Sequence, residues 1–174
     1  MEIIFLVWFA FLHSFYEKST FLLLGNCSLL LVTDKRIMVC LDGSKDSIRA
    51  LRTAILFARQ SDATIVGVHS DVSQGSSRSF SNPKITEGKW SEKTRKIMQF
   101  AKDKCKIRRV NFEGIVIAGY NAGNDLTSFA NNKKNKIEHI VIGSRGTGFP
   151  KGEFFGSVSN FVLHKAKIPV TITK

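Results

Sequence analysis

The chain has 174 residues, of which 43% are hydrophobic and 23% are charged. This length suits one domain with a full hydrophobic core, and the composition excludes a wholly disordered chain. The formal net charge is +12, which favours anionic or phosphorylated partners without identifying one. The three cysteines are scattered and provide neither a disulfide framework nor a zinc-ligand spacing. The sequence therefore predicts a reducing, cytoplasmic location.

The first 34 residues differ in composition from the rest. Residues 3–12 and 21–32 are apolar runs, each shorter than the ~20 residues that span a bilayer, and Glu17 and Lys18 lie between them. Three interpretations stay open: a membrane-associating hairpin or poor anchor, an extra apolar element packed on the domain, or a start codon chosen too far upstream. We favour the third over membrane association, because the mixed, basic sequence begins abruptly at Thr33. The domain then spans residues 35–174, which carry 25 basic and 11 acidic side chains.

Hydrophobic spacing predicts strands that alternate with helices from residue 36 onward. Ser44 is a suitable N-cap for the first helix, and Ile97, Phe100, Ala101 and Cys105 are expected to face the core from the second. In chain order we expect strand 37–41, helix 45–59, strand 63–69, a long loop over 70–88, helix 90–107, strand 112–118, helix 121–131, strand 137–142, a glycine-rich loop, helix 157–166 and strand 170–173.

Strands separated by helices require right-handed crossovers and a mainly parallel sheet that is covered on both faces. The fold class is therefore α/β, with an open, doubly wound sheet. Such sheets bind ligands beyond the carboxyl ends of their strands, where the strand order reverses. The residues predicted at these ends are Asp42, Ser70, Gly119 and Gly143.

The strongest local signal is the segment 143–159, which contains glycines at positions 143, 146, 148, 152 and 156. Glycines leave backbone amides accessible, and the N-terminus of the helix that follows is an anion site. Arg145 and Lys151 add positive charge. The segment contains neither a Walker phosphate loop nor a complete dinucleotide fingerprint. The alternative interpretation is a flexible glycine hinge before a capped helix.

The glycine spacing resembles the signature of the universal stress protein family, G-x2-G-x9-G-[ST]. Gly143, Gly146, Gly156 and Ser157 match it without a gap. Residues 36–44, 66–69 and 168–172 also look like the first, second and last strands of the family. The resemblance covers residues 35–174. Asn121 departs from it, since the family often has a proline at this place.

The resemblance implies a five-stranded sheet of order 3-2-1-4-5, a homodimer and a bound ATP, ADP or AMP, with or without Mg²⁺. Carried over by position, it places Leu41 and Asp42 against the adenosine, with Asp42 on the ribose. Ser70 and Ile142 would lie near the base. The residues that would hold the phosphates are Gly143, Arg145, Gly146, Gly156, Ser157, Val158 and Ser159. Asp42 can also be read as a turn former only, and we interpret His69 as a packed or surface histidine.

Three functions remain in competition. The first is a nucleotide-binding stress or signalling module, in which occupancy changes conformation or partners with little or no turnover. The second is a slow ATPase or nucleotidyl-transfer enzyme, for which the sequence offers cations but no identifiable general base. The third is a basic nucleic-acid-binding protein, although the usual motifs for that role are missing. Homodimerisation is expected through the edge strand at 170–173, whose apolar, β-branched residues would otherwise leave an open edge.

Overall fold

The computed structural model describes residues 21–24, 28–31, 35–72, 84–85, 90–147 and 155–174. The chain divides into two compact units, Met1–Thr33 and Asp34–Lys174. In the first unit, strands β1 (Phe21–Leu24) and β2 (Ser28–Leu31) form an antiparallel hairpin. None of the helices in the described ranges is long and apolar enough to cross a membrane.

The second unit alternates strands and helices as predicted. Its elements are β3 (Arg36–Cys40), α2 (Lys45–Ser61), β4 (Thr64–Ser70), β5 (Lys84–Ile85), α3 (Glu92–Ile107), β6 (Phe112–Ala118), α4 (Ala122–Asn131), the 3₁₀ turn η2 (Lys133–Asn135), β7 (Ile137–Gly143), α5 (Ser157–Lys165) and β8 (Val170–Thr173). Every strand and helix expected from the sequence is present, and their bounds differ by no more than about two residues.

The strands form one sheet in the order β5-β6-β4-β3-β7-β8. The five strands from β6 to β8 are parallel and give the expected order 3-2-1-4-5. The sixth strand, β5, pairs antiparallel with β6 and lies within the segment that the sequence predicts as a loop. A strand of two residues is too short for a hydrophobic period to reveal it.

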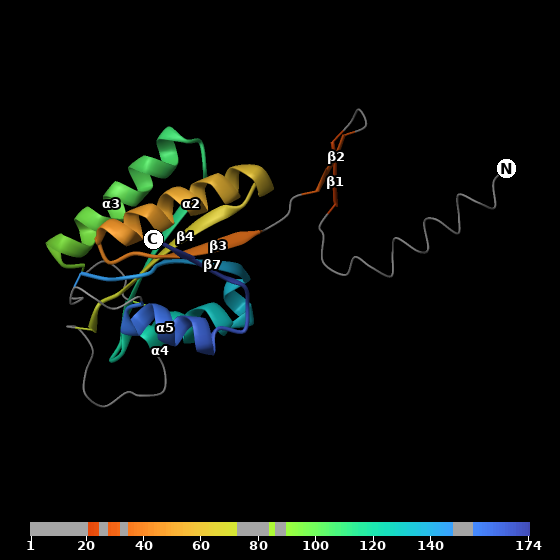
Figure 1. Ribbon diagram of the computed structural model, residues 1–174. Helices are drawn as coiled ribbons and strands as arrows, with labels where there is room; N and C mark the ends of the chain where they lie inside the picture. Colours follow the sequence, from red (N-terminus) through yellow and green to blue (C-terminus); the bar gives the residue numbers. More distant parts are fainter. Residues whose placement is uncertain (1–20, 25–27, 32–34, 73–83, 86–89, 148–154) are drawn as a thin grey trace. The chain divides into compact units, whose positions relative to one another are not determined.

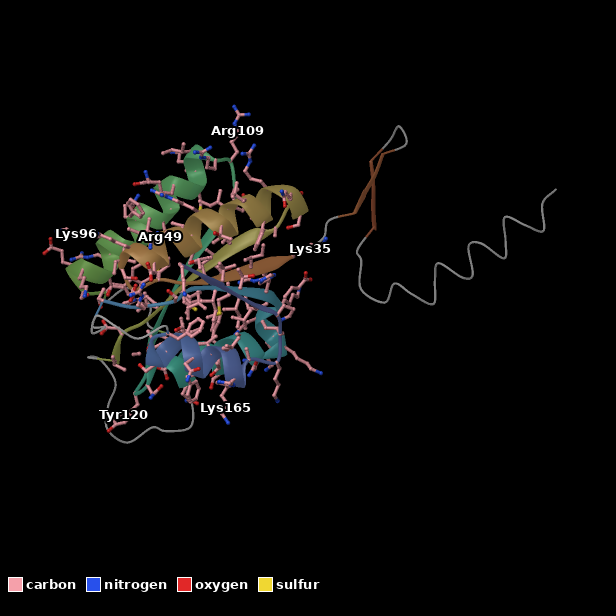
Figure 2. All side chains as sticks on the ribbon, in the orientation of Figure 1. Lys35, Arg49, Lys96, Arg109, Tyr120 and Lys165 are labelled. Carbon is pink, nitrogen blue, oxygen red and sulfur yellow. The ribbon has the colours of Figure 1, made fainter. Side chains whose placement is uncertain are left out.

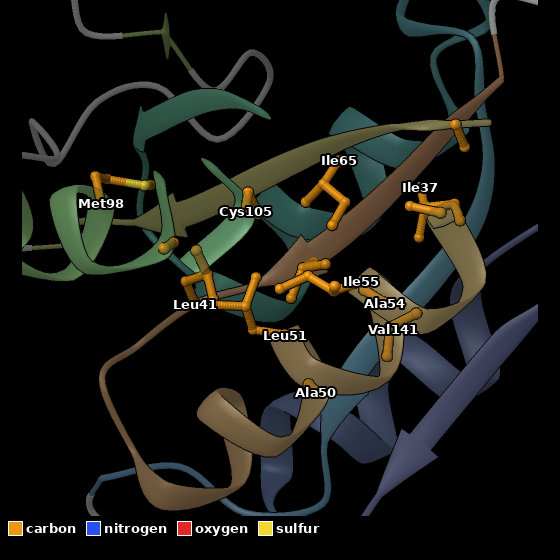
Figure 3. Packing of buried hydrophobic residues seen from close by; sticks show 14 of the residues in the cluster. Ile37, Leu41, Ala50, Leu51, Ala54, Ile55, Ile65, Met98, Cys105 and Val141 are labelled. Carbon is orange, nitrogen blue, oxygen red and sulfur yellow. The ribbon is translucent and has the colours of Figure 1, made fainter. Parts of the chain in front are cut away.

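Two layers of helices cover the sheet (Figure 1). Helices α2 and α3 lie on one face, and α4 and α5 lie on the other. Alternate residues of β3 supply the two cores: Ile37 and Val39 join the α2–α3 side, whereas Met38 and Cys40 join the other. Figure 3 shows Leu51 and Ile55 of α2 packed into the first of these cores.

The core-facing side of α3 differs from the expectation at one position. Phe100 is exposed, and the buried positions are Thr94, Met98, Ala101 and Cys105. These four recur at intervals of four, three and four residues, which keeps them on one stripe of the helix. Phe100 lies about 100° around the helix from Ala101 and therefore points away from the sheet.

Polar side chains cap three of the helices at their N-termini. Ser44, Ser91 and Asn121 each accept a hydrogen bond from the backbone N–H three residues later. The cap at Ser44 confirms the prediction. Asn121 begins α4 in the same way, which accounts for its departure from the proline common in the family pattern.

Candidate functional site

Strand β3 lies at the centre of the sheet, and the chain continues to β4 on one side of it and later to β7 on the other, so the strand order reverses at β3. A cavity of about 300 Å³ lies at the carboxyl ends of these three strands. This is the place where open α/β sheets bind ligands. The residues that the resemblance to the family assigns to the site all line this cavity: Leu41, Asp42, Ser70, Ile142, Gly143, Arg145, Gly146, Gly156, Ser157, Val158 and Ser159. Gly119, which the sequence also places at a strand end, is not among the lining residues. Of the other candidates, Lys151 lies outside the described residues.

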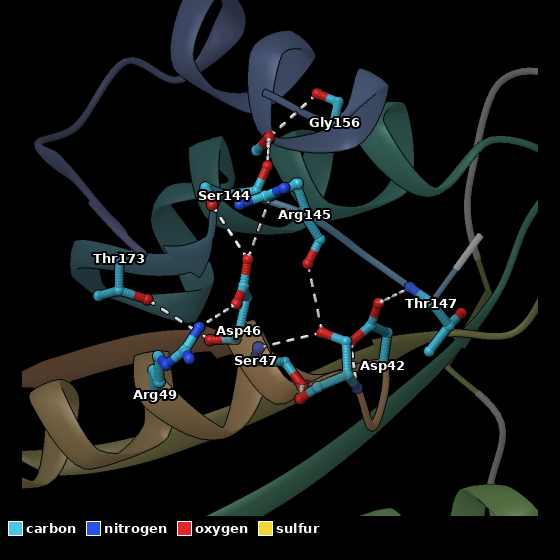
Figure 4. Close-up of polar contacts among 11 residues, drawn as sticks. Asp42, Asp46, Ser47, Arg49, Ser144, Arg145, Thr147, Gly156 and Thr173 are labelled. Atoms are coloured by element: carbon cyan, nitrogen blue, oxygen red, sulfur yellow. Dashed lines mark hydrogen bonds and ion pairs between the residues drawn. The ribbon is translucent and has the colours of Figure 1, made fainter. Parts of the chain in front are cut away.

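Asp42 links the turn after β3 to the glycine loop (Figure 4). Its Oδ1 accepts a hydrogen bond from the Ser44 N–H at 2.8 Å, and its Oδ2 accepts one from the Thr147 N–H at 3.1 Å. The turn-forming interpretation of Asp42 is therefore correct. Each carboxylate oxygen accepts up to two hydrogen bonds, so the side chain keeps acceptor capacity toward the cavity.

Two glycines of the signature, Gly143 and Gly146, lie against Asp46 in the first turn of α2 and Asp42 in the turn before it. A Cβ on Gly143 would lie 2.6 Å from the carbonyl carbon of Asp46, and one on Gly146 would lie 2.8 Å from Oδ2 of Asp42. Both distances are too short for a side chain. The glycines therefore let the loop after β7 pack directly against the start of α2.

The N-terminus of α5 opens onto the cavity. Gly156 is the N-cap, and it makes no side-chain capping bond to the first turn. The first amide groups of a helix have no acceptor within the helix, and they carry the positive end of its dipole. This end of α5 is thus suited to an anion.

Ser144 and Ser159 fasten α5 to the end of β7. The Ser144 carbonyl accepts hydrogen bonds from the Gly156 N–H and from the Ser159 hydroxyl, both at 2.8 Å. Ser159 is buried, so its hydroxyl fixes the helix start in this structure. Ser157, by contrast, is exposed at the mouth of the helix.

A buried carboxylate in the first turn of α2 organises the cations beside the loop. Asp46 accepts hydrogen bonds from the Ser144 hydroxyl at 3.0 Å and from Nη1 of Arg49 at 2.5 Å. Nε of Arg145 lies 3.8 Å from Oδ2 of Asp46. Figure 4 shows Arg145 and Arg49 approaching Asp46 from opposite sides. Asp46 therefore couples the first helix, the glycine loop and, through its carbonyl, the hydroxyl of Thr173 on β8.

The opposite wall of the cavity comes from β3, β4 and α4. The hydroxyl of Ser70 donates to Oδ2 of Asp125 at 2.8 Å, and Asp125 is buried. Nδ1 of His69 donates to the carbonyl of Leu41 at 2.6 Å, since a carbonyl can only accept. His69 is half-buried and lines the cavity. The bond holds the ring of His69 against the end of β3, as is expected of a packed histidine.

The sequence-based list omitted seven residues that line the cavity: Cys40, Ser44, Ser47, His69, Ala122, Leu126 and Thr147. Ala122 and Leu126 are four residues apart on α4, and that spacing marks a helix face. Nothing in the local sequence indicated that this face of α4 closes the site.

Cys40 lines the cavity as a neutral thiol. Burial, and secondarily the charge of Asp42, raises the pKa of the Cys40 thiol far above its usual value, so Cys40 contributes an apolar wall.

Comparisons with known proteins agree with this geometry. The model of the universal stress protein family matches residues 34–174. A universal stress protein of Methanocaldococcus jannaschii is 30% identical over 149 residues, which are 80% of this chain and 82% of that protein. The solved universal stress protein of Archaeoglobus fulgidus has a TM-score of 0.62 and 24% identity, covering 82% of this chain and all of that one.

Other solved structures of similar fold contain nucleotides. A universal stress protein in complex with cAMP has a TM-score of 0.61 and 22% identity, covering 80% of this chain and 96% of that one. Further structures of the family are complexes with dAMP, from Archaeoglobus fulgidus, and with AMP, from Arabidopsis thaliana. The family match over most of the chain, the shared sheet order and the glycine loop lead to one conclusion: the chain belongs to the universal stress protein family.

Proposed function

We propose that the cavity at the ends of β3, β4 and β7 binds an adenine nucleotide, with ATP, ADP and AMP as the candidates. The observation that carries the proposal is the N-terminus of α5, which has no side-chain capping bond from the described residues and opens onto the same cavity as Asp42 and Arg145. One pocket thus offers acceptors for ribose hydroxyls and donors for phosphate. The cAMP, dAMP and AMP complexes of related proteins support the same ligand class.

In the proposed pose, the base lies against Leu41, Ser70 and Ile142. Asp42 accepts hydrogen bonds from the ribose. The phosphates lie against the backbone of Gly143, Gly146 and Gly156, where no side chain intervenes. The donors that face them are the amides of Ser157, Val158 and Ser159, the hydroxyl of Ser157 and the Arg145 guanidinium. A Mg²⁺ bound to a nucleoside triphosphate would supply charge neutralisation between its outer phosphates.

We further propose that nucleotide occupancy acts as a signal in the cytoplasm, with little or no hydrolysis. Asp42 accepts two backbone N–H groups and Nδ1 of His69 donates to the Leu41 carbonyl, which leaves acceptor capacity on Asp42 and on Nε2 of His69. The alternative of a slow ATPase would use one of these two groups as its general base. Cys40 and Cys105 are buried free thiols, which supports a reducing compartment. A single-turnover assay with labelled ATP and Mg²⁺ separates this role from that of a slow ATPase or nucleotidyl transferase.

Gly156→Val tests the phosphate site. The backbone angles of Gly156, φ −74° and ψ 157°, lie in a region that valine adopts readily, so the variant is expected to fold. Its side chain would enter the cavity beside the first amides of α5. We expect the affinity for AMP and ATP to fall by about tenfold or more, as for the loss of several charge-assisted bonds.

Gly114→Ala is the matched control. It lies on β6, away from the cavity, and an added Cβ would make only ordinary contacts, the nearest at 3.4 Å. Isothermal titration calorimetry measures both variants, with circular dichroism to confirm folding. Unchanged nucleotide affinity in a folded Gly156→Val variant would contradict the proposal, as would a wild-type protein that binds no adenine nucleotide.

A further inference from the structure

The outer face of α2 and α3 carries a second concave feature. A groove of about 470 Å³ runs between the two helices, on the side of the sheet where both pack. Leu51 and Ile55 of α2 form its buried floor. The nucleotide site and this groove share no lining residue, so the groove is a separate surface.

Three large apolar side chains line the groove and remain exposed. Leu56 is 59% exposed, Phe100 is 39% exposed and Ile107 is 72% exposed. Single exposed apolar residues are ordinary on protein surfaces. Three of them around one groove, two on α3 and one on α2, form a contiguous patch, which is typical of an interaction site.

The charged residues along the groove all have the same sign. Arg52 and Arg59 of α2 face Lys104 and Arg108 of the α3 side, and none of the described residues that line the groove is acidic. Within the described parts of the chain, none of these four cations forms an ion pair. Lys104 instead lies over the ring of Phe100, with Nζ 5.1 Å from the ring centroid.

Positive charge continues beyond the groove on α3. Figure 2 shows Lys96 and Arg109 projecting outward near the two ends of this helix. Lys96 is paired with Glu92, so the cations that remain to attract a negatively charged partner lie mainly at the groove and at the C-terminal end of α3. An apolar floor between cationic rims is complementary to a ligand with an apolar face flanked by acidic groups.

We propose that this groove binds an acidic amphipathic helix of a partner protein. Arg52 and Arg59 are seven residues apart, which is about 10.5 Å along α2 and equals two turns of a partner helix. Apolar anchors spaced i, i+3/i+4 and i+7 would fill the groove, and flanking Asp or Glu residues would face the rims. A concave groove with an aliphatic floor suits inserted apolar side chains better than it suits the surface of a bilayer or the backbone of a nucleic acid.

A peptide-display selection on the full chain tests the proposal. A library of random 16-residue peptides is panned on the wild-type protein, and the recovered peptides are synthesised and titrated by fluorescence anisotropy. We expect sequences with apolar residues at helical spacing and acidic residues beside them. Binding should weaken by about tenfold in Leu56→Ser/Ile107→Ser and in Arg59→Glu/Arg108→Glu.

Matched controls come from the opposite face of the sheet and from a basic turn. Leu163→Ser replaces an exposed apolar residue of α5, and Lys133→Glu/Lys134→Glu reverses two exposed charges of η2. Both should bind the peptides within about twofold of wild type. All of the substituted positions are exposed, so circular dichroism should confirm folded variants.

Three outcomes would overturn the proposal. One is a selection that recovers no acidic amphipathic motif. Another is peptide binding that the groove variants leave unchanged. The third is a groove-dependent attachment to vesicles of phosphatidylserine and phosphatidylcholine without peptide binding, which would identify a membrane surface as the ligand. Since the groove is separate from the nucleotide cavity, none of these outcomes depends on whether a nucleotide binds.

Discussion

At the scale of single residues, Asp46 connects more of the candidate site than any residue chosen from the sequence. Its carboxylate accepts from Ser144, which is 98 residues further along the chain, and lies beside both Arg49 and Arg145. From sequence it reads as an ordinary acid in the first turn of a helix, where the dipole favours negative charge. Only the fold reveals that it is buried against the glycine loop.

Asp46→Ala should destabilise the protein by about 1–3 kcal/mol, because Ser144 loses its acceptor in a buried site. Urea unfolding followed by circular dichroism measures the free energy of unfolding. Lys45→Ala, at the exposed position before it, is the control and should change stability by less than about 0.5 kcal/mol. Equal stability of Asp46→Ala and wild type would mean that the cluster around Asp46 contributes nothing to the fold.

Asp42 lines the cavity for a reason that the sequence only partly contained. The position after a buried strand and before Gly43 indicates a turn, and the carboxylate does accept the Ser44 N–H. Its second bond, to the Thr147 N–H, joins segments that meet only when β3 and β7 become neighbours. Local spacing carries no information on that pairing.

At the scale of elements, β8 is an edge strand of the sheet, and we expect the predicted homodimer to form through it. The carbonyls of Pro169 and Thr173 accept hydrogen bonds from Ile140 and Ser144 of the β7 segment. Alternate residues of a strand direct their backbone groups to opposite sides, so the amide of Ile172 points to the open edge. Such an edge favours pairing with a second copy across a two-fold axis.

Ile172→Pro should convert the proposed homodimer to a monomer, because it removes a donor from the open edge and leaves the bonds of Pro169 and Thr173 to the β7 segment in place. Ile172→Ala is the matched control: it loses the same packing but keeps the amide, and should remain dimeric. Analytical ultracentrifugation gives the mass of each. Should Ile172→Pro remain a dimer, the interface lies elsewhere.

A titratable side chain joins β7 to β8. Nε2 of His139 hydrogen-bonds to Oγ1 of Thr171 at 2.8 Å, and its ring packs beside Phe57. Burial lowers the pKa of His139 below 6.5. The unfolded chain therefore takes up a proton at higher pH than the folded protein does, so this histidine favours unfolding as the pH falls below 6.5.

In His139→Gln the free energy of unfolding should consequently fall less between pH 7.5 and pH 5.5 than in the wild type. Glutamine does not titrate, and it can still bond to Thr171. His164→Gln, at an exposed position of α5, makes the same substitution away from the β7–β8 contact and is the control. Urea midpoints at the two pH values compare the three proteins. A His139→Gln variant with the same pH dependence as wild type would show that His139 titrates equally in both states.

At the scale of the whole molecule, both core clusters of the described residues are built from residues 37–172. They pack on the two faces of one sheet and draw on β3, β4, β6, β7 and β8. The unit Asp34–Lys174 therefore holds a complete core of its own. The segment before it is expected to be dispensable for folding and for nucleotide binding.

A fragment of residues 34–174 should unfold in one cooperative transition and bind AMP within about twofold of the full chain. Thermal unfolding and calorimetry provide the two measurements. Loss of cooperativity in the fragment, with a cooperative full chain, would assign residues 1–33 to the fold and favour the interpretation of an apolar element packed on the domain.

The sequence by itself determined the order of strands and helices, because hydrophobic period and capping residues are local properties. It also placed the site at the ends of the strands, since parallel crossovers bring those ends to one edge. The resemblance to the family added the sheet order 3-2-1-4-5. Eleven residues chosen in this way line one cavity.

The tertiary structure alone decided which distant groups meet. The approach of Asp46 to Ser144 and Arg145, the pairing of β5 with β6, and the outward direction of Phe100 depend on how strands align and helices rotate on the sheet. The groove between α2 and α3 arises in the same way, from two helices that each look amphipathic alone. Long-range packing selects these contacts, and no local pattern encodes them.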